Sequence, residues 1–309
     1  MLLHTGPMKI AIILNGISLN KKFFYHEILP ALSAVADTEV FETRTRNDAW
    51  SLASKAVEKQ FDLILAAGGD GTVYQVLNGI LEGRETYKDL PVMGILPVGT
   101  GNDFARTLNL KSDAASSAAM VRNFVCRQFD VGKVDYTTAE GRRDSQYFIN
   151  VADIGMGPEV VAKVMKSGRP FGVGVTYYMS ILATFFTYKP KKILAKAPGW
   201  EWENKMRTFA VANGQYFGDG LCIAPDAKPD DGMFEVFACA DASIFDFILH
   251  SIPLKQGKRV SHPKVSYLRT TSVELTSKES CSIEADGEMI GWLPARIEMA
   301  PFKLKFLVP

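Results

Sequence analysis

The chain has few cysteines, almost no net charge and no long apolar run, and each absence excludes a class of protein. Its four cysteines lie at least 17 residues apart, so there is neither a CxxC motif nor a dense disulfide framework: Cys126, Cys222, Cys239 and Cys281. We expect buried, reduced thiols in a cytoplasmic protein. The net charge of +1 argues against bulk nucleic-acid binding and leaves room only for local basic patches.

The sequence also lacks the patterns of a signal peptide and of a membrane span. The residues before Met8 are too few and too uncharged for a signal peptide, so we expect the fold to begin at Met8. The longest uncharged stretch, Phe171 to Tyr188, carries several glycine, serine and threonine residues. A transmembrane helix needs about 20 mainly apolar residues. We interpret this stretch as a buried or interfacial helix.

What is present is the composition of an ordinary globular protein, with 47% hydrophobic and 22% charged residues. A length of 309 residues favours two domains. The first third alternates short apolar runs with helical periodicity, which is typical of βα units around a parallel sheet. From about Asp130 short apolar runs bounded by turn residues dominate. We therefore predict an α/β domain over 8–130 and an all-β sandwich or barrel over 131–309.

The expected elements follow from these patterns. In the first domain the strands are Lys9 to Leu14, Glu39 to Thr43, Asp62 to Ala67 and Val92 to Leu96, with helices at Phe23 to Ala36, Asp48 to Lys59, after Thr72, and at Phe104 to Leu108. In the second domain the strands are Gln146 to Val151, Met206 to Ala212, Met233 to Ala238, Ser272 to Leu275, Ser282 to Glu284 and Lys303 to Leu307. Two helices interrupt them, at Val173 to Tyr188 and Ile244 to Ile252.

The first motif with chemical content is a glycine loop between a strand and a helix. The strand that ends at Ala67 is followed by Gly68, Gly69, Asp70, Gly71 and Thr72, and then by apolar residues at helical spacing. Such a junction directs backbone N–H groups and the positive end of a helix dipole at one point, where glycines let a phosphate approach. Asp70 would repel a triphosphate unless a cation lies between them. It suggests Mg²⁺ or a catalytic proton acceptor; the alternative is a tight Asp-Gly turn.

A second glycine loop, Pro97 to Asp103, follows the strand Val92 to Leu96, and Asn15-Gly16 follows the first strand. The carboxyl ends of parallel strands share one edge of a sheet, where open α/β sheets bind ligands. We therefore expect all three loops to converge on one nucleotide.

The two glycine loops together resemble those of the diacylglycerol kinase catalytic family, which includes sphingosine, ceramide and bacterial lipid kinases. Further segments are similar to family motifs in the family's order and extend the resemblance over nearly the whole chain: Asp130 to Lys133, Asn150 to Gly155, Asn213 to Gly218, Ala224 to Gly232 and Asp286 to Glu288. The resemblance implies a parallel sheet of the NAD-kinase and phosphofructokinase kind, followed by a β-sandwich. It also implies an ATP-dependent kinase whose acceptor is a lipid hydroxyl.

The resemblance also assigns residue roles. Glu288 would be the general base, with Asp70 and Asp103 as further catalytic carboxylates. The nucleotide contacts would be Asn15, Thr43, the loop from Gly68 to Thr72, Gly99, Thr100 and Asn102, with Asn102 and Asp103 near the phosphates. A Mg²⁺ in the second domain would take the Asp231 carboxylate, the carbonyls of Lys228 and Met233, and Asp130 through water, a donor set that suits this ion.

The chain departs from the family pattern at three places, and one of them is Asp219, where a third glycine is common. Tyr74-Gln75 stands where an Asn-Glu or His-Glu pair is usual, so a neutral amide replaces a carboxylate. The first loop reads Asn15-Gly-Ile-Ser-Leu-Asn20 and lacks the usual proline and closing glycine. These changes bear on nucleotide affinity and choice, but they spare Asp70, Asp103 and Glu288.

A lipid acceptor implies a membrane surface as partner. The stretches Val173 to Tyr188 and Phe245 to Leu249, each followed by lysines, could insert apolar groups beside anionic lipid, or could simply pack on the sandwich. We expect a cytoplasmic protein that is peripheral to the inner face of the membrane. The sequence leaves open whether the protein forms a homodimer. The rival functions are an NAD kinase, which shares the Gly68 to Thr72 loop, and a nucleotide-binding protein without catalysis.

Overall fold

The computed structural model describes residues 8–309 except 46, 85, 88 and 168–172. The residues before Met8, and Phe171 and Gly172 at the start of the uncharged stretch, therefore lie outside the described part. The contacts divide the chain into two units: Met1–Phe129 with Phe302–Pro309, and Asp130–Pro301. The strands β5 (Val125–Thr137) and β16 (Glu288–Val308) each run from one unit into the other.

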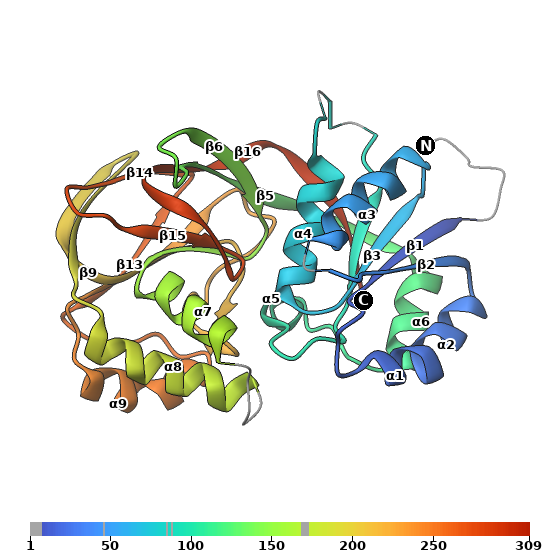
Figure 1. The fold of residues 1–309 in the computed structure, drawn as a ribbon, viewed down its shortest axis with the longest axis horizontal. Helices are drawn as coiled ribbons and strands as arrows, with labels where there is room; N and C mark the ends of the chain where they lie inside the picture. Colours follow the sequence, from blue (N-terminus) through green and yellow to red (C-terminus); the bar gives the residue numbers. More distant parts are fainter. Residues whose placement is uncertain (1–7, 46, 85, 88, 168–172) are drawn as a thin grey trace. The chain divides into compact units, whose positions relative to one another are not determined.

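The first unit is a parallel sheet covered by helices on both faces (Figure 1). Its strands pair in the order β2, β1, β3, β4 and are all parallel: β1 (Lys9–Leu14), β2 (Asp37–Glu42), β3 (Leu63–Ala67) and β4 (Val92–Leu96). Every residue of β3 and β4 is buried, as continuous apolar runs predict for parallel strands covered on both faces. The parallel sheet predicted for this part of the chain is confirmed.

The helices of this unit pack in two layers. On one face of the sheet, α3 (Asp48–Glu58) packs against α4 (Asp70–Leu81). On the other face lie the consecutive helical segments α1 (Lys21–Phe23), η1 (Phe24–Ile28) and α2 (Leu29–Ser33), with α6 (Ala114–Asn123). The short helix α5 (Asp103–Thr107) follows β4. Phe306 near the end of β16 pairs in parallel with Met93 of β4, which places the last residues of the chain in this unit.

The second unit is mainly antiparallel. Its remaining strands are β6 (Arg143–Phe148), β7 (Val151–Gly155), β8 (Lys191–Ala197), β9 (Trp200–Ala212), β12 (Phe234–Ala240), β13 (Val265–Thr270), β14 (Ser272–Ser277) and β15 (Ser282–Ala285), with the small hairpin β10 (Tyr216–Phe217) and β11 (Leu221–Cys222). Strand pairing closes a ring through β7, β15, β16, β14, β8 and β9, and β12 and β13 extend it from β9. The β-rich second region is confirmed, with a barrel-like sheet.

Three helices of this unit lie near one another: α7 (Met156–Lys166), α8 (Val173–Thr187) and α9 (Ile244–Lys255). The prediction of only two helices here was incomplete: α7 follows β7 directly, and the Met156-Gly-Pro at its start is typical of a turn. The predicted strand Gln146 to Val151 is also two strands. β6 ends at Phe148, and the backbone N–H groups of Ile149 and Asn150 donate to Asp286 instead of continuing the ladder.

No helix in the described part of the chain combines the length and the apolar character that crossing a bilayer requires.

Candidate active site

Four loops of the first unit follow the carboxyl ends of its parallel strands. Asn15 follows β1, Thr43 follows β2, Gly68 follows β3 and Pro97 follows β4. Because these strands are neighbours and run in the same direction, the loops meet at one edge of the sheet. The structure thus brings together the segments that the sequence assigned to the nucleotide.

The first loop is fixed by hydrogen bonds to its neighbours. The backbone N–H of Gly16 donates to the Thr43 hydroxyl at 3.0 Å, and Thr43 is buried. The Ser18 hydroxyl and the Asn20 side-chain amide donate to the Val98 carbonyl at 2.9 and 3.1 Å. Ser18 and Asn20 were not among the predicted site residues. They hold this loop against the second glycine loop although the loop lacks the usual proline and closing glycine.

The two glycine loops touch through their backbones. The N–H of Gly99 donates to the carbonyl of Gly68 at 3.1 Å. A Cβ atom on Gly99 would lie 2.3 Å from the Cα of Gly69, so this position accepts only glycine without a shift of the loop. The loops are therefore one structural unit rather than two independent turns.

Asp70 links the same two loops through its side chain. Its Oδ2 accepts the backbone N–H of Asp103 at 3.1 Å, and its Oδ1 accepts that of Phe104 at 3.1 Å. Burial raises the pKa of Asp70, while these N–H donors oppose the rise. Asp103 is itself buried at the start of α5. The Asp70 carboxylate thus organises the second loop, a role that the sequence did not predict for it.

The tip of the second loop is shaped by Asn102. This residue adopts a left-handed backbone with φ 54°, and its side-chain amide donates to the carbonyls of Gly99 at 2.9 Å and Pro97 at 3.3 Å. Thr100 at the tip is exposed, whereas Thr72 in the first turn of α4 is buried. Of the predicted nucleotide contacts in this loop, Thr100 is therefore the one whose side chain reaches solvent, and Asn102 mainly maintains the loop.

The residues that depart from the family pattern are inside the fold. Tyr74 and Gln75 lie on α4 with exposed fractions of 4% and 8%. The Oε1 atom of Gln75 is buried and has no hydrogen-bond partner in the described part of the chain. An amide at this position avoids the cost of burying a carboxylate charge.

In the second unit, Glu288 directly follows a tight turn. Asp286 and Gly287 both have positive φ, 49° and 84°, and Ala285 pairs with Glu288 across the β15–β16 hairpin. A two-residue Asp-Gly turn of this kind matches the twist of the strands. The Asp286 carboxylate is buried and accepts the N–H groups of Ile149, Asn150 and Val151 at 2.9, 2.9 and 3.0 Å. The Asp-Gly-Glu motif is therefore a turn that holds Glu288 in a defined place.

The predicted metal loop, Lys228 to Met233, is organised by Asp130. The Asp130 N–H donates to the Pro229 carbonyl at 2.7 Å, and its Oδ2 accepts the Gly232 N–H at 2.7 Å. Asp130 is buried, and its carbonyl also accepts the side-chain amide of Asn213 at 3.0 Å. The structure thus brings Asp130 to the loop that the sequence assigned to Mg²⁺.

Asp231 in this loop is already paired. Its Oδ2 accepts from the Arg269 guanidinium at 2.6 Å, and its Oδ1 accepts the N–H of Met233 at 3.1 Å. Arg269 also lies 2.7 Å from the buried Glu235. The donor types suit Mg²⁺, but within the described residues no three His, Cys, Asp or Glu side chains gather as a metal site. A cation at this loop would share Asp231 with Arg269 and rely on loop carbonyls for its other ligands.

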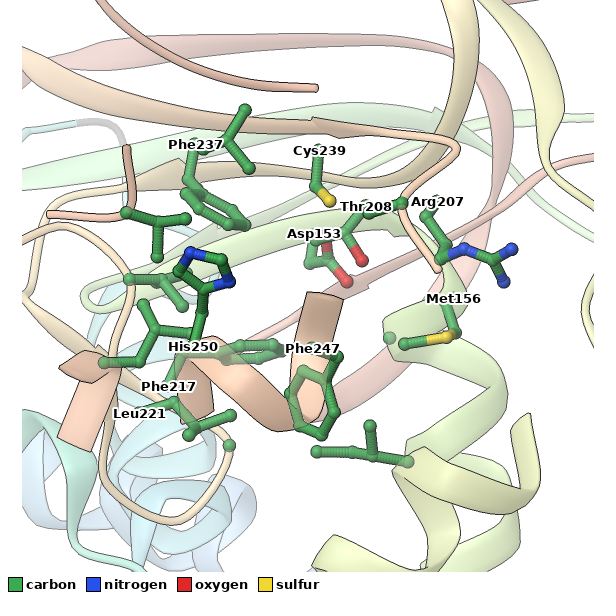
Figure 2. Close-up of a pocket in the computed structure, with 18 of the residues that line it drawn as sticks. Asp153, Met156, Arg207, Thr208, Phe217, Leu221, Phe237, Cys239, Phe247 and His250 are labelled. Atoms are coloured by element: carbon green, nitrogen blue, oxygen red, sulfur yellow. The ribbon is translucent and has the colours of Figure 1, made fainter. Parts of the chain in front are cut away.

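A cavity of about 110 Å³ lies in the second unit between the sheet and its three helices. Its walls are almost wholly apolar and include Met156 of α7, Ile181 of α8, Phe247 of α9 and Phe237 of β12. In Figure 2 the Asp153 carboxylate points into the space between these apolar side chains. No local pattern in the sequence marks this cavity, because the residues that line it come from segments that are distant in the sequence.

Two buried acids of this unit were not among the predicted site residues. Asp153 on β7 and Glu284 on β15 each have an exposed fraction of 0%. Burial raises the pKa of Asp153 well above its ordinary value. Burial, and then the nearby Asp153, raise the pKa of Glu284 in the same direction. Alternation gives no signal for either acid, because every residue of β7 is buried and Glu284 lies between the apolar Ile283 and Ala285 of β15.

Comparison with known families agrees with this architecture. Residues 9–134 match the model of the diacylglycerol kinase catalytic domain, and residues 151–308 match the YegS C-terminal NAD kinase beta sandwich-like domain. The chain belongs to the diacylglycerol kinase catalytic-domain family. Kinases of this family use ATP.

Relatives of the same family match over most of the chain. The diacylglycerol kinase of Bacillus subtilis (strain 168) is 29% identical over 283 residues, which cover 91% of this chain and 88% of the relative. That of Staphylococcus carnosus (strain TM300) is 27% identical, with the same coverage. A solved diacylglycerol kinase from Bacillus anthracis str. Sterne superposes with a TM-score of 0.72 at 22% identity, covering 99% of this chain and 98% of its own. It has the same fold.

Proposed function

We propose that the protein transfers the γ-phosphoryl group of ATP to the hydroxyl of a lipid such as diacylglycerol. The interlocked loops Gly68 to Thr72 and Pro97 to Asp103 carry this proposal. Asp70 and the Gly99 backbone hold them together, so that backbone N–H groups, the start of α4 and the Thr100 hydroxyl gather at one edge of the sheet. Preorganised donors of this kind bind a triphosphate and offset its charge during transfer.

Glu288 is our proposed general base. Phosphorylation of an alcohol needs an acceptor for the hydroxyl proton, and a carboxylate is suited to that task. The turn at Asp286 and Gly287 supports this role, because three N–H donors to Asp286 fix the turn from which Glu288 emerges. A Mg²⁺ at the Lys228 to Met233 loop would add positive charge beside Asp231.

The apolar cavity of the second unit supports a lipid acceptor over a water-soluble one. Its lining offers an aliphatic chain a place out of water, and burial of apolar surface stabilises by about 25 cal/mol per Å². The name diacylglycerol kinase, carried by the relatives, agrees with such an acceptor.

An anionic lipid surface is our proposed partner. The helix α9 is apolar on both sides: Phe247 and Leu254 line the cavity, while other residues spaced as on one helix face are exposed, namely Phe245, Ile248, Leu249 and Ile252. On α8, Val175, Met179 and Phe186 are exposed as well. Exposed lysines follow both helices, at Lys189 and at Lys255 and Lys258. Apolar groups beside lysines suit the interface of a membrane with anionic headgroups, which would keep the protein peripheral to the inner face.

The experiment that tests this function is phosphate transfer from labelled ATP to a panel of acceptors. Vesicles that contain diacylglycerol, ceramide, a sphingoid base or phosphatidylglycerol are compared with soluble NAD, and products are identified by mass spectrometry. Label in a lipid supports the proposal and names the acceptor. Label in NAD alone establishes an NAD kinase, and ATP binding without transfer to any acceptor establishes a non-catalytic nucleotide-binding protein.

A further inference from the structure

Two buried carboxyl groups lie directly opposite each other in the sheet of the second unit. Asp153 of β7 and Glu284 of β15 are register partners in an antiparallel pair, so their side chains leave the same face. Residues in such positions have Cβ atoms about 4.5–5.5 Å apart. Neither residue has any exposed surface. The pair therefore faces itself rather than water.

The oxygen atoms of this pair are poorly satisfied. Glu284 Oε2 accepts the backbone N–H of Gly287 at 2.7 Å. Glu284 Oε1 and both carboxylate oxygens of Asp153 are buried and make no hydrogen bond of good geometry among the described residues. The backbone N–H groups of Ile154, Gly157 and Phe209 lie near Asp153 and only partly oppose the rise in its pKa. Asp286, two residues from Glu284, differs because three backbone N–H groups surround it, which stabilises its charge. The unsatisfied oxygens thus belong to the two acids that face each other.

Two buried carboxylates at register partners repel each other when both are charged, and in an apolar interior little screens that repulsion. One proton between them removes the repulsion and lets one carboxyl donate to the other, which satisfies oxygens that otherwise lack a partner. A Cβ on Gly157 of α7 would lie only 1.8 Å from Asp153 Oδ2, so the helix closes tightly over this carboxyl.

We infer that Asp153 and Glu284 share one proton, and that this proton holds the β15–β16 hairpin in the position from which Glu288 acts. The hairpin depends on the pair because Glu284 also bonds to Gly287 within the turn. The role toward Glu288 rests on the proposed function, whereas the shared proton does not. Asp153 and Glu284 are in this account positioning residues.

Other titratable groups surround the pair. Those that interact electrostatically with the pair are Asp286 and Glu288 of the hairpin, Tyr188 and Cys281, and Glu159 of α7 interacts in turn with Tyr188 and Cys281. Those that line the cavity together with Asp153 are Arg207, Asp246, His250 and His262. The Arg207 guanidinium is engaged by Asp241 at 2.8 Å. The Asp286 charge is held by its three N–H donors. The remaining groups are present in all the variants below, so the differences between variants report on the pair.

The shared proton sets the sign of the pH dependence. In the unfolded chain both acids release their protons near pH 4. The folded pair keeps one proton to a higher pH because burial raises the pKa of both groups. The folded state then binds more protons than the unfolded state, so the free energy of unfolding falls as pH rises from about 4 to the raised pKa and levels off above it.

The test compares the full-length wild type with Glu284→Gln and Asp153→Asn, which keep the shape but not the shared proton. Denaturant unfolding is measured from pH 5 to pH 9, with Glu274→Gln at an exposed position of β14 as the matched control. We expect this pair to take up about one proton on folding in the wild type and the control and none in either amide variant, because the amide donates to the remaining carboxylate; about two protons in the wild type and one in each variant would overturn the sharing. Parallel pH profiles for all four proteins would overturn the shared proton. If an amide variant does not fold, infrared spectroscopy of the wild type decides, and absence of a protonated carboxyl band at pH 7 overturns it.

The positioning role is tested by hydrogen exchange and by kinetics. At pH values above the pair's pKa, exchange of the amides from Cys281 to Trp292 becomes faster in the wild type than in Glu284→Gln at the same pH. The kcat profile of the wild type then declines on the alkaline side, and that of Glu284→Gln does not. If the pH profile of stability differs between the wild type and Glu284→Gln but hydrogen exchange in the hairpin is the same in both, the pair affects stability alone. That result would refute the positioning role. If no phosphate transfer is found at all, the exchange experiment still decides the proposal while the proposed function fails.

Discussion

Asp70 accepts the backbone N–H of Asp103 through its Oδ2 at 3.1 Å, although the two residues are 33 positions apart in the chain. The sequence suggested a carboxylate beside a triphosphate, with a metal ion or a proton as its partner. In the structure both oxygens of Asp70 face the N–H groups at the start of α5. The residue therefore fixes the loop that we propose to bind the nucleotide.

Replacement of Asp70 by Asn tests this relationship. One acceptor oxygen becomes an amide donor that faces a backbone N–H group, so we expect a loss of about 2 kcal/mol, equivalent to about 30-fold in kcat/KM for ATP. Steady-state kinetics and thermal unfolding are measured together. Asp48→Asn is the matched control, because Asp48 also accepts backbone N–H groups, from Arg44 and Thr45, before helix α3. An equal effect of both variants on kcat/KM would contradict the role of Asp70.

The backbone contact between the two glycine loops yields a second prediction. In Gly99→Ala the new Cβ would lie 2.3 Å from the Cα of Gly69, which forces the loops apart. We expect nucleotide affinity to fall about 5- to 150-fold, since a strained close contact costs about 1–3 kcal/mol. Calorimetry with ATP measures this. In the control Gly141→Ala, the new Cβ sits at a positive φ but meets no atom within 4 Å. This variant should lose some stability and keep its affinity for ATP.

We propose that the Arg269 guanidinium competes with Mg²⁺ for the Asp231 carboxylate. Its guanidinium lies beside Asp231 and beside the buried Glu235. Burial raises the pKa of Glu235, and the charges of Arg269 and Arg259 oppose the rise. In Arg269→Met we expect Mg²⁺ to raise the unfolding temperature by more than in the wild type, since Asp231 loses its competing cation. A response to Mg²⁺ that is equal in the two proteins would contradict competition at this loop.

Vesicle binding tests whether the exposed apolar residues of α8 and α9 contact a membrane. Phe245 and Leu249 are 78% and 71% exposed on α9. We expect Phe245→Ser with Leu249→Ser to lower co-sedimentation with vesicles of anionic lipid at least 10-fold, because two apolar side chains no longer insert. Val125→Ser, an exposed apolar residue on β5, is the control and should bind as the wild type does. Binding of the wild type that does not depend on anionic lipid would refute the charge component.

The sequence allowed the parallel sheet to be predicted almost strand by strand, because fully buried strands are short apolar runs and the glycine loops mark their ends. The strand Val92–Leu96 was predicted with its correct bounds. The pairing of Phe306 with Met93, far apart in the chain, has no local signal, since one apolar residue in a strand can pair with many others. Helix α7 was missed because Met156-Gly-Pro at its start reads as a turn.

The candidate site was partly predictable for a similar reason. Glycine loops and the Asp-Gly-Glu turn are local patterns that carry their chemistry in adjacent residues. Other contacts join distant segments and have no local signal: those of Asp70 with α5, of Arg269 with Asp231, and of Asp153 with Glu284. Only the register of β7 with β15 brings that last pair together.

The most direct test of the account is the effect of Glu288→Gln on phosphate transfer to a lipid acceptor in vesicles. A general base contributes about 10²- to 10⁴-fold, so we predict that kcat falls by at least 100-fold while the KM for ATP changes little. Glu140→Gln, an exposed carboxylate in the turn between β5 and β6, should retain the wild-type rate. A Glu288→Gln variant that transfers phosphate at the wild-type rate would contradict the assignment of the base.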